Sequence, residues 1–278
     1  MRWTPGQRSR NLEDRRGSRM VSRGLPIGIG GFLVLLVLSF LTGQDLVSPL
    51  LQQGASQPAT EVQGPLETTP EEEERVDFVS FVLDDLQDTW PRILGTRYRE
   101  ARLVLFRGAT SSACGLGQSA MGPFYCPADE QVYLDLEFFD QLARRFGAPG
   151  EFAQAYVIAH EVGHHVQHLL GINQRVRQLQ QSRPGDANAL SVRQELQADC
   201  FAGVWGHTTA RRNLLEPGDV EAGLAAAAAI GDDRLQGQVA GRVRPESFTH
   251  GTSAQRMEWL RRGLETGSVE ACDTFGTR

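Results

Sequence analysis

Two histidines and a glutamate that could bind a metal ion lie in the stretch His160-Glu161-Val162-Gly163-His164. If the stretch is helical, residues four apart share one face, so His160 and His164 can bind one zinc ion together. Glu161 then lies about 100° around the helix from His160 and can reach a water molecule beside the metal as a general base. The same pattern also arises by chance, so further residues are needed to support the site.

A catalytic zinc site needs a third protein ligand and an open position for water. Glu195 is our candidate for the third ligand, because it lies on the next expected helix in a largely apolar sequence. Asp199 lies four residues further along the same face, where it can accept the second N–H of a zinc-binding histidine and fix its tautomer. Two acids at this spacing could instead form a solvated face.

Three other residues are rival ligands. His165 points away from the face that carries the motif histidines, and His168 lies about 12 Å along the helix axis from His160. We therefore expect both to be surface or core histidines. Cys200, a softer ligand next to Asp199, is expected to be buried or disulfide-bonded instead.

A donor for a developing oxyanion is the last group that such a site would use. His250 precedes an expected helix start at Thr252 or Ser253, so it could be held at the rim of a cleft. Arg256 follows about one and a half turns later and could lock this segment or pair with an acid.

The elements that must position these residues are mostly helical. Helical patterns cover 151–170, ending before Gly171, and 190–212, and the small residue Gly163 could let another segment approach closely. We also expect helices over 70–90, 138–146, 217–230 and 253–264, strands over 101–106 and 131–136, and connections over 111–129, 174–188 and around Pro245. The pattern predicts an α+β fold with a small sheet.

Four cysteines allow three pairings, and sequence proximity favours Cys114–Cys126, which leaves Cys200–Cys272. The second bridge would tie the C-terminal tail to the helix that carries Glu195. Such bridges are allowed if this part of the chain is exported.

The N-terminal part of the chain has a different composition. Residues 1–24 are rich in arginine, and Leu25–Gly43 has no charged residue over a length of roughly 30 Å. We expect a basic cytoplasmic segment over 1–24, a single transmembrane helix over 25–43, a flexible stalk over 44–70 and an extracytoplasmic metallopeptidase domain over 71–278, periplasmic or at the cell surface. A cleaved signal peptide is the competing interpretation, but no small-x-small cleavage site follows the apolar run.

The overall composition limits the partners. The chain has 278 residues, 40% of them hydrophobic, and a formal net charge of −6. Phosphate binding needs a basic surface, so nucleic acid is not expected as a partner.

The pair of motifs resembles the gluzincin pattern, HExxH followed by ExxxD. His250 with Arg256 resembles the His-Pro-x4-Arg element of membrane gluzincins of the prenyl-protease type, although Gly251 stands in place of the proline. More closely, blocks along nearly the whole chain resemble the bacterial neutral zinc metallopeptidase family. These blocks are Met1–Trp3, Asn11–Gly17, Gly122–Pro127, Tyr133–Asp135, His160–His165, Gln194–Gly203, His250–Thr252 and Cys272–Phe275.

The resemblance implies a zincin-like fold, one zinc ion and a single membrane anchor, and it strengthens the case for His250. In zincins an edge strand above the active-site helix binds extended peptide, and 124–136 would supply it here. We expect zinc-dependent hydrolysis of peptide or protein substrates. The alternatives are a membrane-anchored binding or assembly protein with a structural zinc site, and a zinc hydrolase that acts on another bond. Glu161 favours the enzyme, because a structural site needs no water-activating carboxylate.

Overall fold

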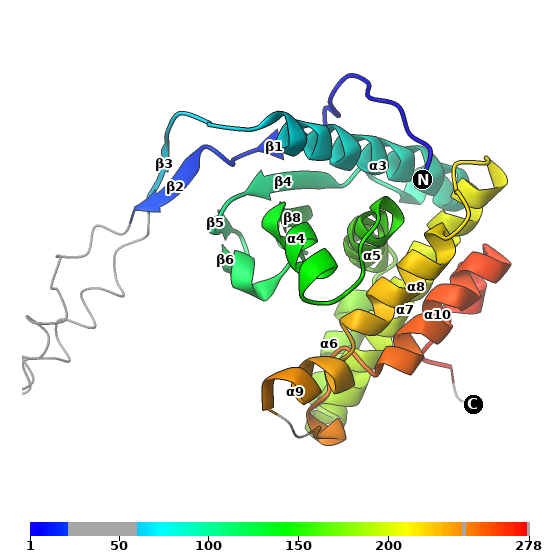
Figure 1. Cartoon of the computed structure of the whole chain (residues 1–278). Helices are drawn as coiled ribbons and strands as arrows, with labels where there is room; N and C mark the ends of the chain where they lie inside the picture. The colour runs from blue at the N-terminus through cyan, green and yellow to red at the C-terminus, as the bar shows by residue number, and fades with distance from the viewer. Residues whose placement is uncertain (22–59, 241–242, 277–278) are drawn as a thin grey trace, which may run out of the picture.

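Helices predominate and a small sheet lies on one side of them in the computed structural model, which describes residues 1–21, 60–240 and 243–276 (Figure 1). This combination of helices with a small sheet confirms the predicted α+β class. Four strands form the main sheet in the order β1-β4-β8-β7, where β1 is Leu12–Asp14, β4 Arg102–Phe106, β8 Gln131–Asp135 and β7 Phe124–Cys126. β1 and β8 pair in parallel with β4, and β7 pairs antiparallel with β8 at the edge.

The two faces of this sheet are covered differently. Leu103 and Leu105 join the main hydrophobic core with the helices, whereas Val104 and Phe106 belong to a smaller cluster on the opposite face. A hairpin of β5 (Ala109–Ser112) and β6 (Gly115–Gln118) lies near this second face, where a Cβ on Gly117 would come within 2.5 Å of the Phe124 ring.

Five expected helices are present with nearly the expected ends. They are α3 (Pro70–Leu94), α4 (Glu137–Arg144), α5 (Glu151–Leu169), α7 (Ala187–Arg211) and α8 (Asp219–Ala229). The last expected helix, α10 (Ser253–Thr266), begins with a capping box between Thr252 and Gln255, which satisfies the first free backbone N–H groups. Short 3-10 turns occupy Gly95–Arg97, Ser119–Met121, Pro184–Asp186, Pro245–Ser247 and Glu270–Cys272.

Two helices lie where we expected connections. α6 (Ile172–Ser182) is polar and buries only Asn173 and Val176, so its sequence lacks a broad apolar stripe. α9 (Asp232–Ala240) occupies the region before Pro245. Tertiary contacts, which a local pattern does not contain, hold both helices in place.

The helices α5 and α7, which carry the two motifs, approach each other closely at Gly163. A Cβ on this residue would lie 3.0 Å from the Ala198 carbonyl oxygen, closer than a side chain normally comes. The expectation that a small residue at Gly163 admits a neighbouring segment is confirmed. Both predicted disulfides, Cys114–Cys126 and Cys200–Cys272, are also present.

The N-terminal residues are part of the folded body, whereas we had expected a separate segment over 1–24. Residues of β1 pair with β4, and the Trp3 ring packs 5.4 Å from that of Phe78 on α3. A second hairpin joins β2 (Ser18–Val21) to β3 (Thr60–Gln63), so the end of the expected stalk is a strand. The predicted transmembrane helix 25–43 and stalk residues 44–59 lie outside the described residues. Within the described ranges, no helix has the length and apolarity that a membrane crossing requires.

Candidate metal centre

Three predicted ligands from two helices converge on one point. His160 and His164 extend from α5 and Glu195 from α7, and their ligand atoms all lie within 4.8 Å of one another. His160 Nε2 is 3.2 Å from Glu195 Oε2, and His164 Nε2 is 3.4 Å from Glu195 Oε1.

The two separations from Glu195 match those between ligands of a tetrahedral zinc ion. Nitrogen and oxygen ligands lie about 2.1 Å from zinc, so two of them at tetrahedral angles are about 3.4 Å apart. The donor set of two imidazoles and one carboxylate is also the type found at catalytic zinc sites, which leaves a fourth position open. The residues present therefore fit the ion.

Each metal-facing histidine is held by a second residue through its other ring nitrogen. His160 Nδ1 lies 2.8 Å from Asp199 Oδ1, and His164 Nδ1 lies 2.9 Å from Gln167 Oε1. Both partners accept the Nδ1 proton, which leaves each Nε2 lone pair free for a metal. Asp199 was expected in this role, whereas Gln167 was missed, although it lies one turn after His164 on the same helix.

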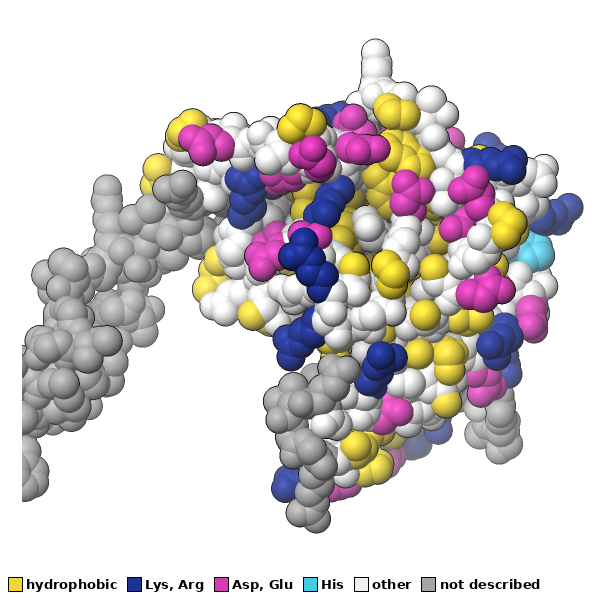
Figure 2. Space-filling view, viewed as in Figure 1, with side chains coloured by type: hydrophobic (Ala, Val, Ile, Leu, Met, Phe, Trp, Pro, Cys, Tyr) yellow, Lys and Arg dark blue, Asp and Glu magenta, His cyan; other side chains and the backbone are white. Residues whose placement is uncertain are grey.

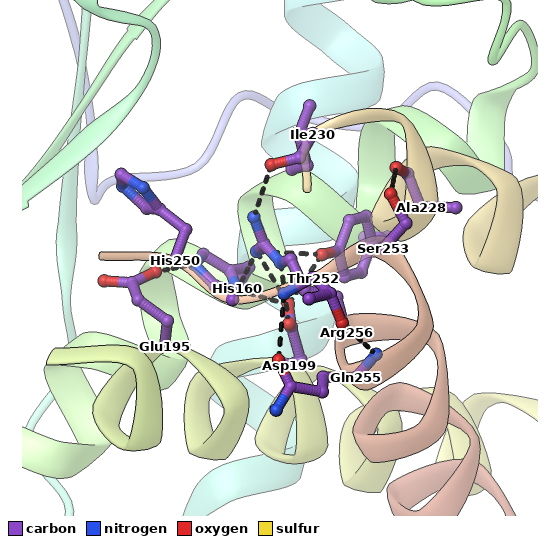
Figure 3. A network of polar contacts seen from close by, with 12 residues as sticks. His160, Glu195, Asp199, Ala228, Ile230, His250, Thr252, Ser253, Gln255 and Arg256 are labelled. Atoms are coloured by element: carbon purple, nitrogen blue, oxygen red, sulfur yellow. Dashed lines mark hydrogen bonds and ion pairs between the residues drawn. The ribbon is translucent and has the colours of Figure 1, made fainter. Parts of the chain in front are cut away.

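Asp199 is itself held by a buried network (Figure 3). Arg256 Nε donates to Asp199 Oδ2 at 2.8 Å, and the Tyr156 hydroxyl donates to Asp199 Oδ1 at 2.6 Å. Arg256 also donates to the Ile230 carbonyl at 3.3 Å, so it joins α10 to the end of α8. Because Asp199 is fully buried, the adjacent guanidinium is needed to compensate its charge. Arg256 thus pairs with an acid, which the sequence left as one of two possible roles.

Burial and neighbouring charges shift the pKa values of the ligand residues. Burial lowers the pKa of His160, but Asp199 and Glu195 outweigh it and raise that pKa to about 10. Burial raises the pKa of Glu195, but His164 and His160 bring it well below its usual range. Both shifts arise because the imidazoles lie close to Glu195 and Asp199, the same convergence that brings the three ligand residues together.

Glu161 lies beside the ligands without joining them. The residue is 8% exposed, lines the cleft, and its carboxylate makes no hydrogen bond or ion pair to the described residues. Burial raises its pKa, while His160 and His164 act in the opposite direction. A carboxylate with free lone pairs and a raised pKa is suited to accept a proton.

His250 lies on the cleft wall, held from behind by Asp232 of α9. Asp232 Oδ2 accepts the backbone N–H groups of Thr249 and His250, each at 2.7 Å, and of Gly251 at 3.2 Å. Asp232 Oδ1 lies 3.2 Å from His250 Nδ1, and this contact, offset by burial, raises the pKa of His250. Asp232 was missed because it is eighteen residues away in the sequence.

Gly251 has a φ of +92°, a value closed to proline and unfavourable for other residues with a Cβ. The loop thus needs glycine at the position where the His-Pro-x4-Arg element has proline.

The two remaining histidines of α5 lie away from the metal-facing atoms, as helix geometry predicted. His165 is buried, with Nε2 2.7 Å from the Arg99 carbonyl and Nδ1 3.1 Å from the Tyr125 hydroxyl. His168 Nε2 lies 3.4 Å from Glu130.

A cleft of about 740 Å³ runs past these groups. Its polar floor contains the metal-facing residues, and Phe124 and Tyr125 of edge strand β7 line another part of it. Its apolar lining includes Met121, Phe138, Phe146, Val157 and Leu235.

A family model described as "Putative neutral zinc metallopeptidase" matches residues 1–275. The chain belongs to this family. It is 50% identical over 288 aligned residues to "Uncharacterized protein YpfJ" of Escherichia coli K12, with 99% of each chain covered. It is also 47% identical over 189 residues to "Uncharacterized protein Mb2605" of Mycobacterium bovis, with 64% of this chain and 63% of the relative covered. No solved structure matches this member of the zinc metallopeptidase family.

Proposed function

We propose that the protein is a zinc-dependent peptidase that hydrolyses peptide bonds in the cleft. The observation that carries the proposal is the combination of a three-residue ligand set with a neighbouring carboxylate, Glu161, that is not a ligand. A structural zinc site usually has a closed fourth position and does not need such a group. When bound, zinc would act as a Lewis acid toward the substrate carbonyl and make a nearby water molecule more acidic.

The chain's own residues supply the proton transfers. Glu161 would accept a proton from the attacking water and then donate it to the nitrogen of the leaving amine. Asp232 stabilises the protonated form of His250 through Nδ1, and in that form His250 would donate a hydrogen bond from Nε2 to the developing oxyanion. Gln167 and Asp199 would keep both metal-facing imidazoles in one tautomer throughout.

An extended peptide is the substrate shape that the cleft suits best. Among the described strands, β7 has a neighbour on one side only, so its outer edge offers backbone hydrogen-bonding groups beside the cleft. The apolar lining would accept a large hydrophobic side chain of the substrate. These features support binding of the peptide along an edge strand, as in zincins. The strand that would bind it is β7, which is shorter than the expected segment 124–136.

The two disulfides support a location outside the cytoplasm, because such bonds persist in oxidising compartments. We propose that the metal centre works there, on exported or surface proteins and peptides.

Replacement of Glu161 by Gln tests the mechanism. We expect Glu161→Gln to lose about 10²–10⁴-fold in kcat on a mixture of quenched fluorescent peptides, because Gln cannot accept the proton. Its zinc content, measured by atomic absorption, should match that of the wild type. Glu195→Gln should instead lose zinc, and the surface variant Glu258→Gln should change neither property.

Unchanged activity in Glu161→Gln would refute the mechanism. A zinc-loaded wild-type protein that hydrolyses none of the peptides, while zinc raises its Tm, would favour the structural-zinc alternative.

A further inference from the structure

The two segments that flank the apolar run 25–43 meet in one folded body. β1, before the run, pairs in parallel with β4, after it, through Leu12 with Leu103, Glu13 with Val104 and Asp14 with Leu105. Hydrogen-bonded strands lie about 4.8 Å apart, whereas the hydrocarbon core of a membrane is about 30 Å thick. The paired strands cannot lie on opposite sides of a membrane.

Contacts along the whole N-terminal segment support this pairing. The Met1 amino group lies 3.1 Å from Glu151 of α5 and 3.3 Å from Asp219 of α8. The Ser9 backbone N–H donates to the Ser80 hydroxyl of α3 at 2.5 Å. These partners lie on three helices, so the N-terminal segment contacts the rest of the domain at several points.

The arginines that suggested a cytoplasmic flank also have partners in the body. Arg16 has a fully buried side chain that contacts Glu72 and Glu73 at the start of α3, at 3.0 and 2.9 Å. Arg8 also pairs with Glu73, and Arg10 lies 2.6 Å from Glu100. The positive charge of Arg8 and Arg16 therefore complements the acidic start of α3, and that of Arg10 complements Glu100, which follows this helix. Basic and acidic side chains are likewise interspersed on the face shown in Figure 2.

The chain leaves and re-enters the body at one place. β2 and β3 pair antiparallel up to Val21 and Thr60, and they project together from one end of the body (Figure 1). The points where the chain departs and returns are thus neighbours.

We propose that the N-terminal segment and the metal centre occupy the same compartment, on one side of any bilayer that the chain contacts. The single crossing expected from the sequence would separate β1 from β4. The uncharged apolar run Leu25–Gly43 is the sequence feature that suggests contact with a bilayer. The inference rests on the fold of the described residues and does not depend on peptidase activity.

Thiol labelling from each side of the membrane tests the proposal. The four cysteines form two disulfides, so one introduced cysteine provides a single free thiol. Arg10→Cys marks the N-terminal segment and Glu258→Cys marks α10, at side chains that are 79% and 56% exposed. Each full-length variant is treated with a membrane-impermeant maleimide in right-side-out and in inside-out vesicles of verified orientation.

We expect the two variants to label in the same vesicle orientation, with the other orientation labelled only after detergent is added. The unmodified chain should not label and serves as the control. Any difference between the two sites in the side from which they label overturns the proposal. Retention of both disulfides in each variant, checked by non-reducing peptide mapping, shows that the fold is intact.

Discussion

The two histidines that face the metal owe their common orientation to different neighbours. His160 is held by the carboxylate of Asp199, and His164 by the amide oxygen of Gln167. The Gln167 side chain in turn donates to the Gln194 carbonyl at 2.7 Å, next to Glu195. A change at Gln167 would therefore act on one metal ligand directly and on another through the backbone of α7.

His250 is the residue whose role is most readily tested by substitution. We expect His250→Ala to lower kcat by about 10²–10³-fold with little change in KM, because it removes a hydrogen bond that strengthens only in the transition state. Zinc content should be unchanged, since His250 is not one of the three ligand residues. Steady-state kinetics with metal analysis checks both expectations.

Asp232→Asn provides the matching test of the residue behind His250. It should lower kcat less than His250→Ala does, because the imidazole remains but is less well oriented. Asp233→Asn is the control, since Asp233 caps Ser253 at 2.8 Å and does not contact His250. A larger loss of kcat in Asp233→Asn than in Asp232→Asn would contradict this role.

The distance between α5 and α7 decides whether ligands from both helices can share one ion. Gly163 allows the approach, because it lies directly against the backbone of Ala198. We expect Gly163→Val to lower the free energy of unfolding by about 1–3 kcal/mol through overpacking, and to weaken zinc binding by moving Glu195 away from the histidines. Chemical denaturation and zinc titration measure the two effects.

Gly185→Val is the control for this prediction. A Cβ at Gly185 would meet no atom within 4 Å, and its φ is not positive. This variant should bind zinc like the wild type. Equal zinc affinity in Gly163→Val would show that the close approach is not required for the site.

The attachment of the N-terminal segment to the rest of the molecule depends on a charged cluster around Arg16. We expect Arg16→Gln to lower the free energy of unfolding by about 3 kcal/mol, because it leaves nearby carboxylates without their buried partner. Arg10→Gln, which removes an exposed pair, should cost less than about 1 kcal/mol.

The effect of Arg16→Gln should depend on pH. Burial raises the pKa of Glu73, but Arg8 and Arg16 outweigh it and lower that pKa from 4.5 to about 2. The stabilisation by Glu73 is thus complete above about pH 4.5 and is lost as the pH falls toward 2. The difference between wild type and Arg16→Gln should shrink over this range in urea denaturation, and a constant difference would contradict the assignment.

Local periodicity and spacing were enough to predict much of the site. Residues four apart on a helix share a face, so the sequence alone identified His160 with His164 and Glu195 with Asp199. Helix geometry also excluded His165 and His168, and the strong apolar patterns predicted α3, α5 and α7 to within a few residues. The two disulfide pairings followed from sequence proximity.

Tertiary structure alone decided the features that depend on distant contacts. Asp232 supports His250 through a loop that local pattern does not describe, and Gln167 looks like an ordinary polar helix residue in the sequence. The three residues of β1 have no strand pattern of their own, and their pairing with β4 comes from a neighbour about ninety residues away. The arginines before the apolar run were taken as a signal of membrane orientation, because a sequence shows charges without their partners.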